Sequence, residues 1–250
     1  MKRREFIYRS AMLAAGIVAT KLVASAKGLG NNTNTDMKKI MIIDGGPRKN
    51  MNTAAMAEAF AEGARSAGAE VKYVRLYDID YKGCRSCMAC QLKGKRVPSC
   101  RFKDGLTDIL AEATQADGLL LASPIYYGEM TAQLRAFYER FTFPWLSYST
   151  GNIQAPKNMP VSVIYTMNAT PAQAEMLHKT MATVHMVLGT ALGHEVEVIQ
   201  ANTTTQVKNY APYDFAEGVA ERKKAWRDAH WEEDLAKARA AGERMAISVI

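Results

Sequence analysis

Short apolar runs alternate with amphipathic segments along most of the chain. Three of the runs, 39–44, 118–123 and 161–166, are almost wholly apolar, which is typical of strands buried on both faces of a sheet. Two others, 71–77 and 195–199, mix apolar and charged residues, as expected for strands nearer a sheet edge. The pattern predicts five strands, with the three apolar ones in the centre.

Segments with helical periodicity separate the runs. The first helix is predicted to begin with Asn52 or Thr53 as its N-cap, to bury Met56 and Phe60, and to end at Gly68. The other predicted helices cover 106–116, about 130–141, 171 to about 188, and 214 to about 245. Because strands and helices alternate, right-handed βαβ units and a parallel sheet are expected. We predict an α/β three-layer sandwich with a five-stranded parallel sheet of order 2-1-3-4-5, which is the flavodoxin-like arrangement.

This strand order also predicts where a ligand binds. In such sheets the ligand lies at the carboxyl ends of the strands where the winding reverses, here the first and third strands. Loops 45–53, 124–128 and 167–170 are expected to gather there, with a cysteine-containing loop beside them. The sequence shows no internal repeat and no second domain.

Residues 1–26 have three parts in the order of an export signal. An arginine pair at positions 3–4 precedes a weakly apolar stretch over 11–20 and a small-x-small cleavage pattern at 24–26. The segment resembles a twin-arginine signal peptide, and a disordered basic tail is the alternative interpretation. The twin-arginine route carries proteins that are already folded, so such a signal is indirect evidence for a bound cofactor. It also predicts a periplasmic location.

Composition and charge narrow the class of protein. The chain has 250 residues, of which 48% are hydrophobic, enough for one substantial domain. We assign 27–37 as a linker and 38–250 as that domain, with a C-terminal helical extension. Residues 1–26 carry +4 of the formal net charge of +7, and the remaining +3 is too weakly basic to argue for nucleic-acid binding. No window approaches the apolar run of about 20 residues that a membrane span needs.

All four cysteines lie in one loop after the second predicted strand. Cys84, Cys87 and Cys90 follow C-x2-C-x2-C spacing, and Cys100 comes after nine further residues. Soft thiolates gathered within a few ångströms are what a metal cluster requires. Four alternatives remain open: a [4Fe–4S] cluster, a structural zinc site, disulfides, and free thiols.

The loop after the first strand has features of a phosphate cradle. Gly45 and Gly46 let a ligand approach the backbone closely, and Arg48 supplies a charged fork. Asn52 and Thr53 present donors at a helix N-terminus, where anions bind. The loop is neither a GxGxxG fingerprint nor a Walker A motif, so an ordinary strand-to-helix turn is the alternative.

Two adjacent aromatic residues, Tyr126 and Tyr127, follow the third strand. Flat rings at the mouth of a sheet suit stacking against a flavin ring, and core packing is the alternative. The loop after the fourth strand, with Met167 and Asn168, is placed to reach the polar edge of such a ring.

Together these motifs resemble the NADPH-dependent FMN reductase family of the flavodoxin-like superfamily. The resemblance covers about residues 38–200 and rests on 45–53, the cysteine loop, 104–106 and 123–128. The cysteine spacing resembles that of the family's iron–sulfur flavoprotein branch. The resemblance implies bound FMN, oxidoreductase chemistry at the flavin, and a homodimer or homotetramer. The expected cofactor-binding residues are Gly46, Pro47, Arg48, Asn50, Asn52, Thr53, Pro124, Ile125, Tyr126, Tyr127, Gly128, Met167 and Asn168, and the expected metal ligands are Cys84, Cys87, Cys90 and Cys100.

The chain departs from the family pattern at three places. Gly46 stands where serine is usual, which removes a hydroxyl from the phosphate cradle, and Met51 stands where glycine is usual. The nine residues before Cys100 exceed the final spacing that is usual in the iron–sulfur branch.

We therefore predict an FMN-dependent oxidoreductase that is exported in the folded state. The flavin performs the redox chemistry, so no catalytic side chain is expected. Relatives take hydride from NAD(P)H, which is scarce outside the cytoplasm, so a quinone, a cytochrome or a partner iron–sulfur protein is an alternative electron donor. A non-catalytic flavodoxin-like electron carrier and a metal-binding module are the alternative functions.

Overall fold

The computed structural model of the chain describes residues 37–95 and 97–248, which belong to one compact unit, Asp36–Ile250. The predicted export signal, and all of the predicted linker except its last residue, lie outside the described residues.

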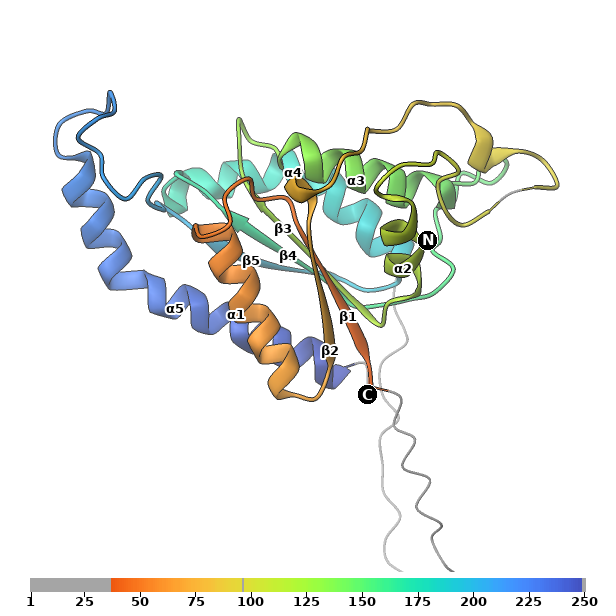
Figure 1. Cartoon of the computed structure of the whole chain (residues 1–250), viewed down its shortest axis with the longest axis horizontal. Coiled ribbons are helices and arrows are strands. Elements are labelled where there is room, and N and C mark those ends of the chain that lie inside the picture. Colours follow the sequence, from red (N-terminus) through yellow and green to blue (C-terminus); the bar gives the residue numbers. More distant parts are fainter. Residues whose placement is uncertain (1–36, 96, 249–250) are drawn as a thin grey trace, which may run out of the picture. The chain divides into compact units, whose positions relative to one another are not determined.

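A five-stranded parallel sheet of order β2-β1-β3-β4-β5 forms the middle layer (Figure 1). The strands are β1 (Lys39–Asp44), β2 (Glu70–Arg75), β3 (Gly118–Pro124), β4 (Val161–Thr166) and β5 (Val196–Ala201). Nearly every residue of β1, β3 and β4 is buried, whereas β2 and β5 are mostly half-buried. The predicted strand order and flavodoxin-like fold are therefore confirmed. The most apolar strands occupy the centre, where both of their faces are covered.

Helices cover both faces of the sheet (Figure 1). One apolar core joins the sheet to α2 (Thr107–Gln115), α3 (Ala132–Thr142) and α4 (Pro171–Leu192). A second core joins the opposite face to α1 (Asn52–Ser66) and α5 (Val219–Ser248). These are the three layers that the sequence predicts.

Helices α1 and α5 cross in direct backbone contact at two glycines. A Cβ atom on Gly63 would lie 1.9 Å from the carbonyl oxygen of Arg239. A Cβ atom on Gly242 would lie 2.0 Å from the carbonyl oxygen of Phe60. Only residues without a side chain allow so close an approach, so the two glycines determine where α5 lies on α1.

Some element boundaries differ from the prediction. The second strand ends at Arg75, because the chain turns into a 3₁₀ helix over Leu76–Asp78. The last helix begins at Val219 and not at residue 214, after Gly218 in the left-handed region at φ = 72°. Residues 202–218 are consequently a loop, and that loop contributes to the site described below. No helix in the described ranges is long and apolar enough to cross a membrane.

Candidate functional site

Four loops meet at the carboxyl ends of the strands around a cavity of about 260 Å³, here called the strand-end cavity. They follow β1, β3, β4 and β5, and three of these are the loops that the strand order predicts. Ten of the thirteen residues expected to bind the cofactor line the cavity: Gly46, Pro47, Arg48, Asn52, Thr53, Pro124, Ile125, Tyr126, Met167 and Asn168.

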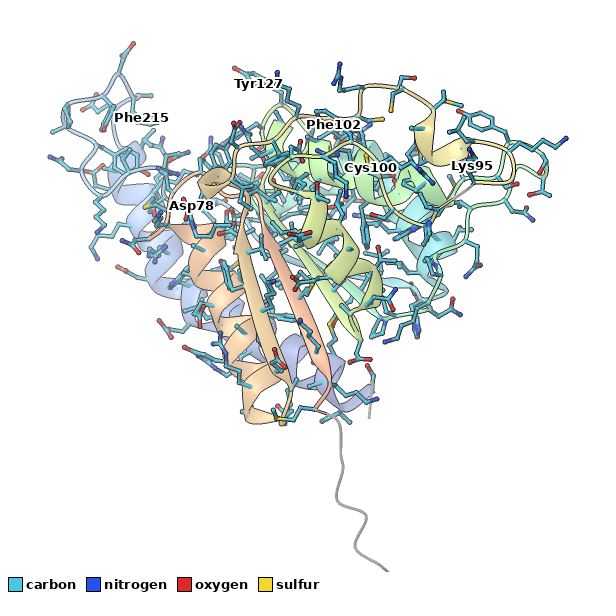
Figure 2. The ribbon with its side chains drawn as sticks, turned by 45° about the vertical axis from the view of Figure 1, so that its right-hand side comes forward. Asp78, Lys95, Cys100, Phe102, Tyr127 and Phe215 are labelled. Atoms are coloured by element: carbon cyan, nitrogen blue, oxygen red, sulfur yellow. The ribbon has the colours of Figure 1, made fainter. Side chains whose placement is uncertain are left out.

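The other three expected residues lie outside this cavity. Asn50 lines a neighbouring cavity. Tyr127 and Gly128 form the tip of a two-residue turn, with φ values of 52° and 85°, closed by backbone hydrogen bonds between Tyr126 and Glu129. Positive φ at both central residues is the geometry of a type I′ hairpin turn. The Tyr127 side chain is fully exposed and points away from the fold (Figure 2).

The fourth loop, after β5, is a part of the site that the sequence reasoning missed. Thr204, Thr205 and Gln206 line the strand-end cavity. The carbonyl oxygen of Thr205 accepts a hydrogen bond from Asn52 Nδ2 at 2.7 Å, and that of Gln206 accepts one from Arg48. The signal was a polar run at 202–206 directly after the last strand, whose carboxyl end must lie at the same edge of the parallel sheet.

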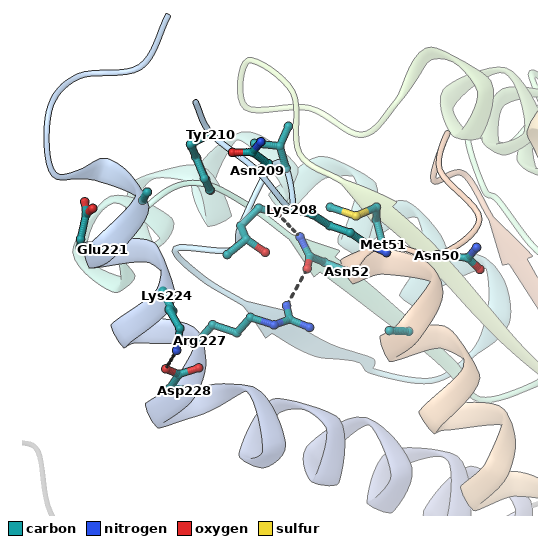
Figure 3. Close-up of a pocket in the computed structure, with 14 residues that line it drawn as sticks. Asn50, Met51, Asn52, Lys208, Asn209, Tyr210, Glu221, Lys224, Arg227 and Asp228 are labelled. Carbon is teal, nitrogen blue, oxygen red and sulfur yellow. Dashed lines mark hydrogen bonds and ion pairs between the residues drawn. The ribbon is translucent and has the colours of Figure 1, made fainter. Parts of the chain in front are cut away.

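Helix α1 begins without a side-chain cap. Met51 occupies the N-cap position, so the prediction that Asn52 or Thr53 caps the helix was wrong. The Asn52 side chain instead donates to the Thr205 carbonyl oxygen and accepts from Arg227 (Figure 3). The Thr53 hydroxyl forms a hydrogen bond with the Thr166 hydroxyl at 2.7 Å. The first backbone N–H groups of α1 thus have no side-chain acceptor from the N-cap residue, and the start of α1 lines the same cavity as Arg48. This arrangement suits an anionic phosphate.

A buried carboxylate, that of Asp44, forms hydrogen bonds that hold the loop after β1. Asp44 accepts hydrogen bonds from the Gly46 backbone N–H at 2.7 Å, and from Tyr73 and Arg75, both at 3.0 Å. Burial raises the pKa of Asp44, and these three donors oppose the rise. A Cβ atom on Gly46 would lie 2.9 Å from Asp44 Oδ1 and 3.2 Å from Thr53 Cβ. Glycine therefore fits this position closely, although serine is usual in the family.

The opposite end of the cavity is more apolar. Ile125 and Met167 border it, and the Tyr126 ring is 45% exposed at its mouth. Asn168 supplies a polar edge and is held by Lys223 of α5, which donates to the Asn168 backbone carbonyl at 3.2 Å and to its side-chain oxygen. Lys223 is only 8% exposed and has no carboxylate partner among the described residues; burial lowers its pKa. An apolar wall with one polar edge suits a flavin ring.

The four cysteines border one narrow space. They are free thiols; Cys90 is buried and Cys84 and Cys87 are exposed. The space among them is about 10 Å³, close to the minimum for one water molecule. Burial, and then the neighbouring thiols with Cys100 first, raise the pKa of Cys90. In the described ranges no three His, Cys, Asp or Glu side chains are arranged to hold a metal ion, so the predicted ligands do not form a metal site in this conformation.

A buried arginine joins the two ends of the cysteine loop. Arg140 of α3 donates to the carbonyl oxygens of Lys82 at 2.9 Å and Phe102 at 2.8 Å. It also pairs with Asp104 at 2.6 Å. Burial alone would raise the pKa of Asp104, but the hydrogen bonds from Arg140 and from the backbone N–H groups of Lys82 and Leu106, together with the Arg140 charge, outweigh it and hold that pKa below its usual range. Phe102 and Cys100 lie together beside α3 (Figure 2), so Arg140 fixes the base of the loop while its tip stays exposed.

Comparison with known sequences gives one family. Residues 38–196 match the NADPH-dependent FMN reductase family. An iron-sulfur flavoprotein of Archaeoglobus fulgidus is 27% identical over 195 residues, covering 78% of this chain and 87% of that protein. One from Methanocaldococcus jannaschii is 31% identical over 102 residues, covering 41% of this chain and 51% of that protein. The chain thus spans about half the length of several curated relatives that it matches.

Solved structures share the fold. The NAD(P)H:quinone oxidoreductase from Methanothermobacter marburgensis superposes with a TM-score of 0.59 at 17% identity, covering 83% of this chain and 96% of that one. An FMN-dependent NADH-azoreductase from Bacillus anthracis, solved in complex with FMN, gives 0.57 at 14% identity, covering 84% and 100%. At these identities the likeness concerns the fold alone. Because the family match extends over more than half of the chain, the chain belongs to the NADPH-dependent FMN reductase family, a family of FMN-dependent oxidoreductases.

Proposed function

We propose that this chain is an FMN-dependent oxidoreductase that binds FMN in the strand-end cavity. The observation that carries the proposal is the pairing of two unlike ends in one cavity. The uncapped start of α1 lies beside Arg48 at one end, and Ile125, Tyr126 and Met167 line the other. An anionic phosphate suits the first end and a flat apolar ring suits the second.

Each chain segment has a separate task in this proposal. Arg48 and the first N–H groups of α1 hold the phosphate, while Asn52 and Thr53 order the loops around it. Ile125 and Tyr126 flank the ring, and Lys223 fixes Asn168 at the ring's polar edge. FMN supplies hydride and single-electron transfer when bound, so the protein's work is binding, orientation and control of access.

The electron donor and acceptor are small molecules or redox proteins. NADPH is the donor that the family name implies. For an exported chain a quinone, a cytochrome or an iron–sulfur protein replaces it. A homodimer or homotetramer is proposed as the working form, because the Tyr126 ring remains 45% exposed at the mouth of the cavity and a second subunit would cover it.

We also propose that the cysteine loop receives an iron–sulfur cluster. Support comes from the C-x2-C-x2-C spacing, the single space that all four thiols border, and relatives that are named iron-sulfur flavoproteins. The space of about 10 Å³ requires the loop to open first. In this proposal the change occurs at the loop tip, which is supported by the two exposed thiols, Cys84 and Cys87, and by the left-handed backbone at Ser86 and Met88. Iron and sulfide analysis of anaerobically purified protein tests this: zinc, or no metal at all, would contradict it.

Export by the twin-arginine route to the periplasm is proposed from the pattern in residues 1–26. In this proposal the chain folds and acquires its cofactor in the cytoplasm before it crosses the membrane. Exchange of both arginines at positions 3–4 for lysine should retain the protein in the cytoplasm. Unchanged export of that variant would argue against the route.

The absorption spectrum of the purified chain tests the main proposal. We expect flavin bands in the purified protein, or after addition of FMN to the colourless form. Protein that stays colourless after FMN is added would contradict flavin binding. Turnover of quinones or free flavins with a chemical reductant separates an enzyme from an electron carrier, which would exchange electrons with a redox protein only.

A further inference from the structure

The cysteine loop, residues 82–103, is strongly basic. It contains seven lysines and arginines and no aspartate or glutamate. Outside this loop, residues 27–250 have a formal net charge of −4. The positive charge of the domain is therefore concentrated in one loop, and such a concentration indicates an anionic partner. The FMN assigned to the strand-end cavity makes no use of this charge.

The cations of the loop face solvent. Six of them lie among the described residues, and all six are exposed: Lys82, Arg85, Lys93, Lys95, Arg101 and Lys103. None of the ion pairs formed by the described residues includes any of the six. Elsewhere on the surface, by contrast, Lys72 pairs with Glu112 and Arg239 pairs with Glu62. The loop therefore presents charge that no carboxylate of the described chain neutralises.

Local contacts hold these cations on one projecting surface. The Lys95 backbone N–H donates to the Leu92 carbonyl oxygen at 3.0 Å, which closes a tight turn. Arg101 Nη2 donates to the Lys95 carbonyl oxygen at 2.9 Å, so the two arms of the loop lie side by side. The Arg85 guanidinium lies 4.8 Å from the centre of the Phe102 ring, on the returning arm. The loop extends beyond the helices at one end of the fold (Figure 1).

Apolar side chains are exposed among the cations. Met88 and Leu92 stand at the two ends of a short 3₁₀ helix and are 40% and 49% exposed. Exposed Tyr148 lies on a neighbouring loop, which Gln91 joins by donating to the Phe143 carbonyl oxygen at 2.9 Å. The Phe143 and Tyr148 rings are in edge contact, 6.3 Å between centres. Apolar residues surrounded by lysine and arginine, with an aromatic residue beside them, are typical of surfaces that enter a lipid headgroup layer.

We propose that the cysteine loop docks on an anionic lipid membrane surface. The cations lie at the lipid phosphates, while Met88 and Leu92 enter the boundary between headgroups and acyl chains. An acidic protein would match the charge as well. It would also need a recess for two apolar side chains on a projecting loop, whereas fluid lipid adapts to them. The exposed apolar residues therefore favour lipid.

Docking at this loop also bears on the electron partner. Of the partners proposed above, a quinone is the one that dissolves in a bilayer. The docked loop would hold the cysteines at the surface from which a quinone is reached. This consequence rests on the proposed function, whereas the docking itself requires no flavin.

Sedimentation with lipid vesicles tests the proposal. Residues 1–26 are themselves basic, so the measurement uses residues 27–250, which include the whole compact unit Asp36–Ile250. We expect this chain to pellet with vesicles of equal parts phosphatidylglycerol and phosphatidylcholine, and to stay in solution with phosphatidylcholine alone. Each cation near an anionic surface contributes about fivefold to affinity, so Lys93→Gln/Lys95→Gln should weaken binding about 25-fold. Salt at about 1 M, which shortens the Debye length to about 3 Å, should release the protein.

A matched variant and a depth probe accompany this measurement. Lys208→Gln/Lys237→Gln removes the same charge from the loop after β5 and from α5, which packs on the opposite face of the sheet from α3. Its vesicle binding should remain within twofold of the parent chain. Leu92→Trp reports insertion. We expect its fluorescence emission to move to shorter wavelengths with anionic vesicles, beyond any shift of the parent chain.

Three results would overturn the docking. The first is no binding to phosphatidylglycerol vesicles. The second is equal weakening by the two double variants, which would assign binding to net charge alone. The third is retention by poly-L-glutamate without a vesicle-dependent shift of Leu92→Trp, which would assign the loop to an acidic protein. FMN titration of the same preparation is a separate measurement, so flavin binding without vesicle binding would leave the proposed function intact.

Discussion

Lys223 donates a hydrogen bond to the backbone carbonyl of Asn168 at 3.2 Å, so the last described helix holds a loop that follows β4. The lysine is buried and has no carboxylate partner in the described part of the chain. Its charge is therefore balanced by amide oxygens alone, an arrangement that is costly to fold and that serves to position Asn168.

Replacement of Lys223 should affect the free energy of unfolding and the affinity for FMN in different ways. We expect Lys223→Met to be at least as stable as the wild-type chain, because it removes a desolvated charge. FMN affinity should fall about five- to tenfold, since Asn168 loses its donor at the polar edge of the cavity. Denaturant unfolding and FMN titration, with Lys237→Met as control, measure the two effects. Unchanged FMN affinity would show that Asn168 does not contact the flavin.

Arg140 of α3 should be the residue on which the base of the cysteine loop depends most. Arg140→Met leaves Asp104 and two carbonyl oxygens without their donor, and we expect a loss of about 3–5 kcal/mol in the free energy of unfolding. Arg135→Met, on the exposed side of the same helix, should cost about 1 kcal/mol or less. Denaturant unfolding of both variants measures the difference. Equal losses would mean that Arg140 does not fix the loop.

The crossing of α1 and α5 should tolerate no side chain at Gly242. A Cβ atom there lies 2.0 Å from the Phe60 carbonyl oxygen, so Gly242→Ala must push the helices apart. We expect a loss of about 3 kcal/mol, at the upper end of overpacking effects. The neighbouring Glu243→Ala should change stability by less than about 0.5 kcal/mol. A Gly242→Ala chain as stable as wild type would contradict the close approach.

Tyr127 occupies a backbone conformation that suits asparagine better. At φ = 52° in a type I′ turn, Tyr127→Asn should raise the free energy of unfolding by about 0.5–1 kcal/mol. Tyr126→Asn, whose φ is not positive, should give no such gain. Thermal unfolding of the two variants provides the comparison. Should Tyr127→Asn instead lower stability, the exposed ring has a contact in the assembled protein.

His185 should make the chain less stable in mild acid. Its Nε2 lies 3.0 Å from the Tyr165 hydroxyl, and burial, followed by the charge of His178, lowers its pKa. The unfolded chain then binds the proton more readily, so stability is retained above about pH 6.5 and lost as the pH falls below it. His185→Gln should flatten this slope between pH 7 and 5. An equal slope in the variant would assign it to other groups.

Local patterns predicted the fold because the proportion of apolar residues in each strand indicates how deeply that strand is buried. The apolar run 118–123 and the mixed apolar and charged run 71–77 were enough to place one strand at the centre and the other at an edge. Glycine and arginine after β1 likewise indicated the cavity. Contacts between distant segments were not predictable: Arg227 and Lys223 lie in a charged helix whose sequence resembles any solvated helix. Asp44 was missed for a similar reason, since its partners Tyr73 and Arg75 come from another strand.

The close crossing of α1 and α5 at Gly63 and Gly242 also bears on when the cofactor binds during synthesis of the chain. The last helix supplies Arg227 and Lys223 to loops made much earlier, and the glycine contact determines its position. A nascent chain that still lacks α5 also lacks the hydrogen bonds from Arg227 to Asn52 and from Lys223 to Asn168, so its site is incomplete. Cofactor capture is therefore expected after translation of the last helix, which would make a loaded cofactor a sign that the whole domain has folded.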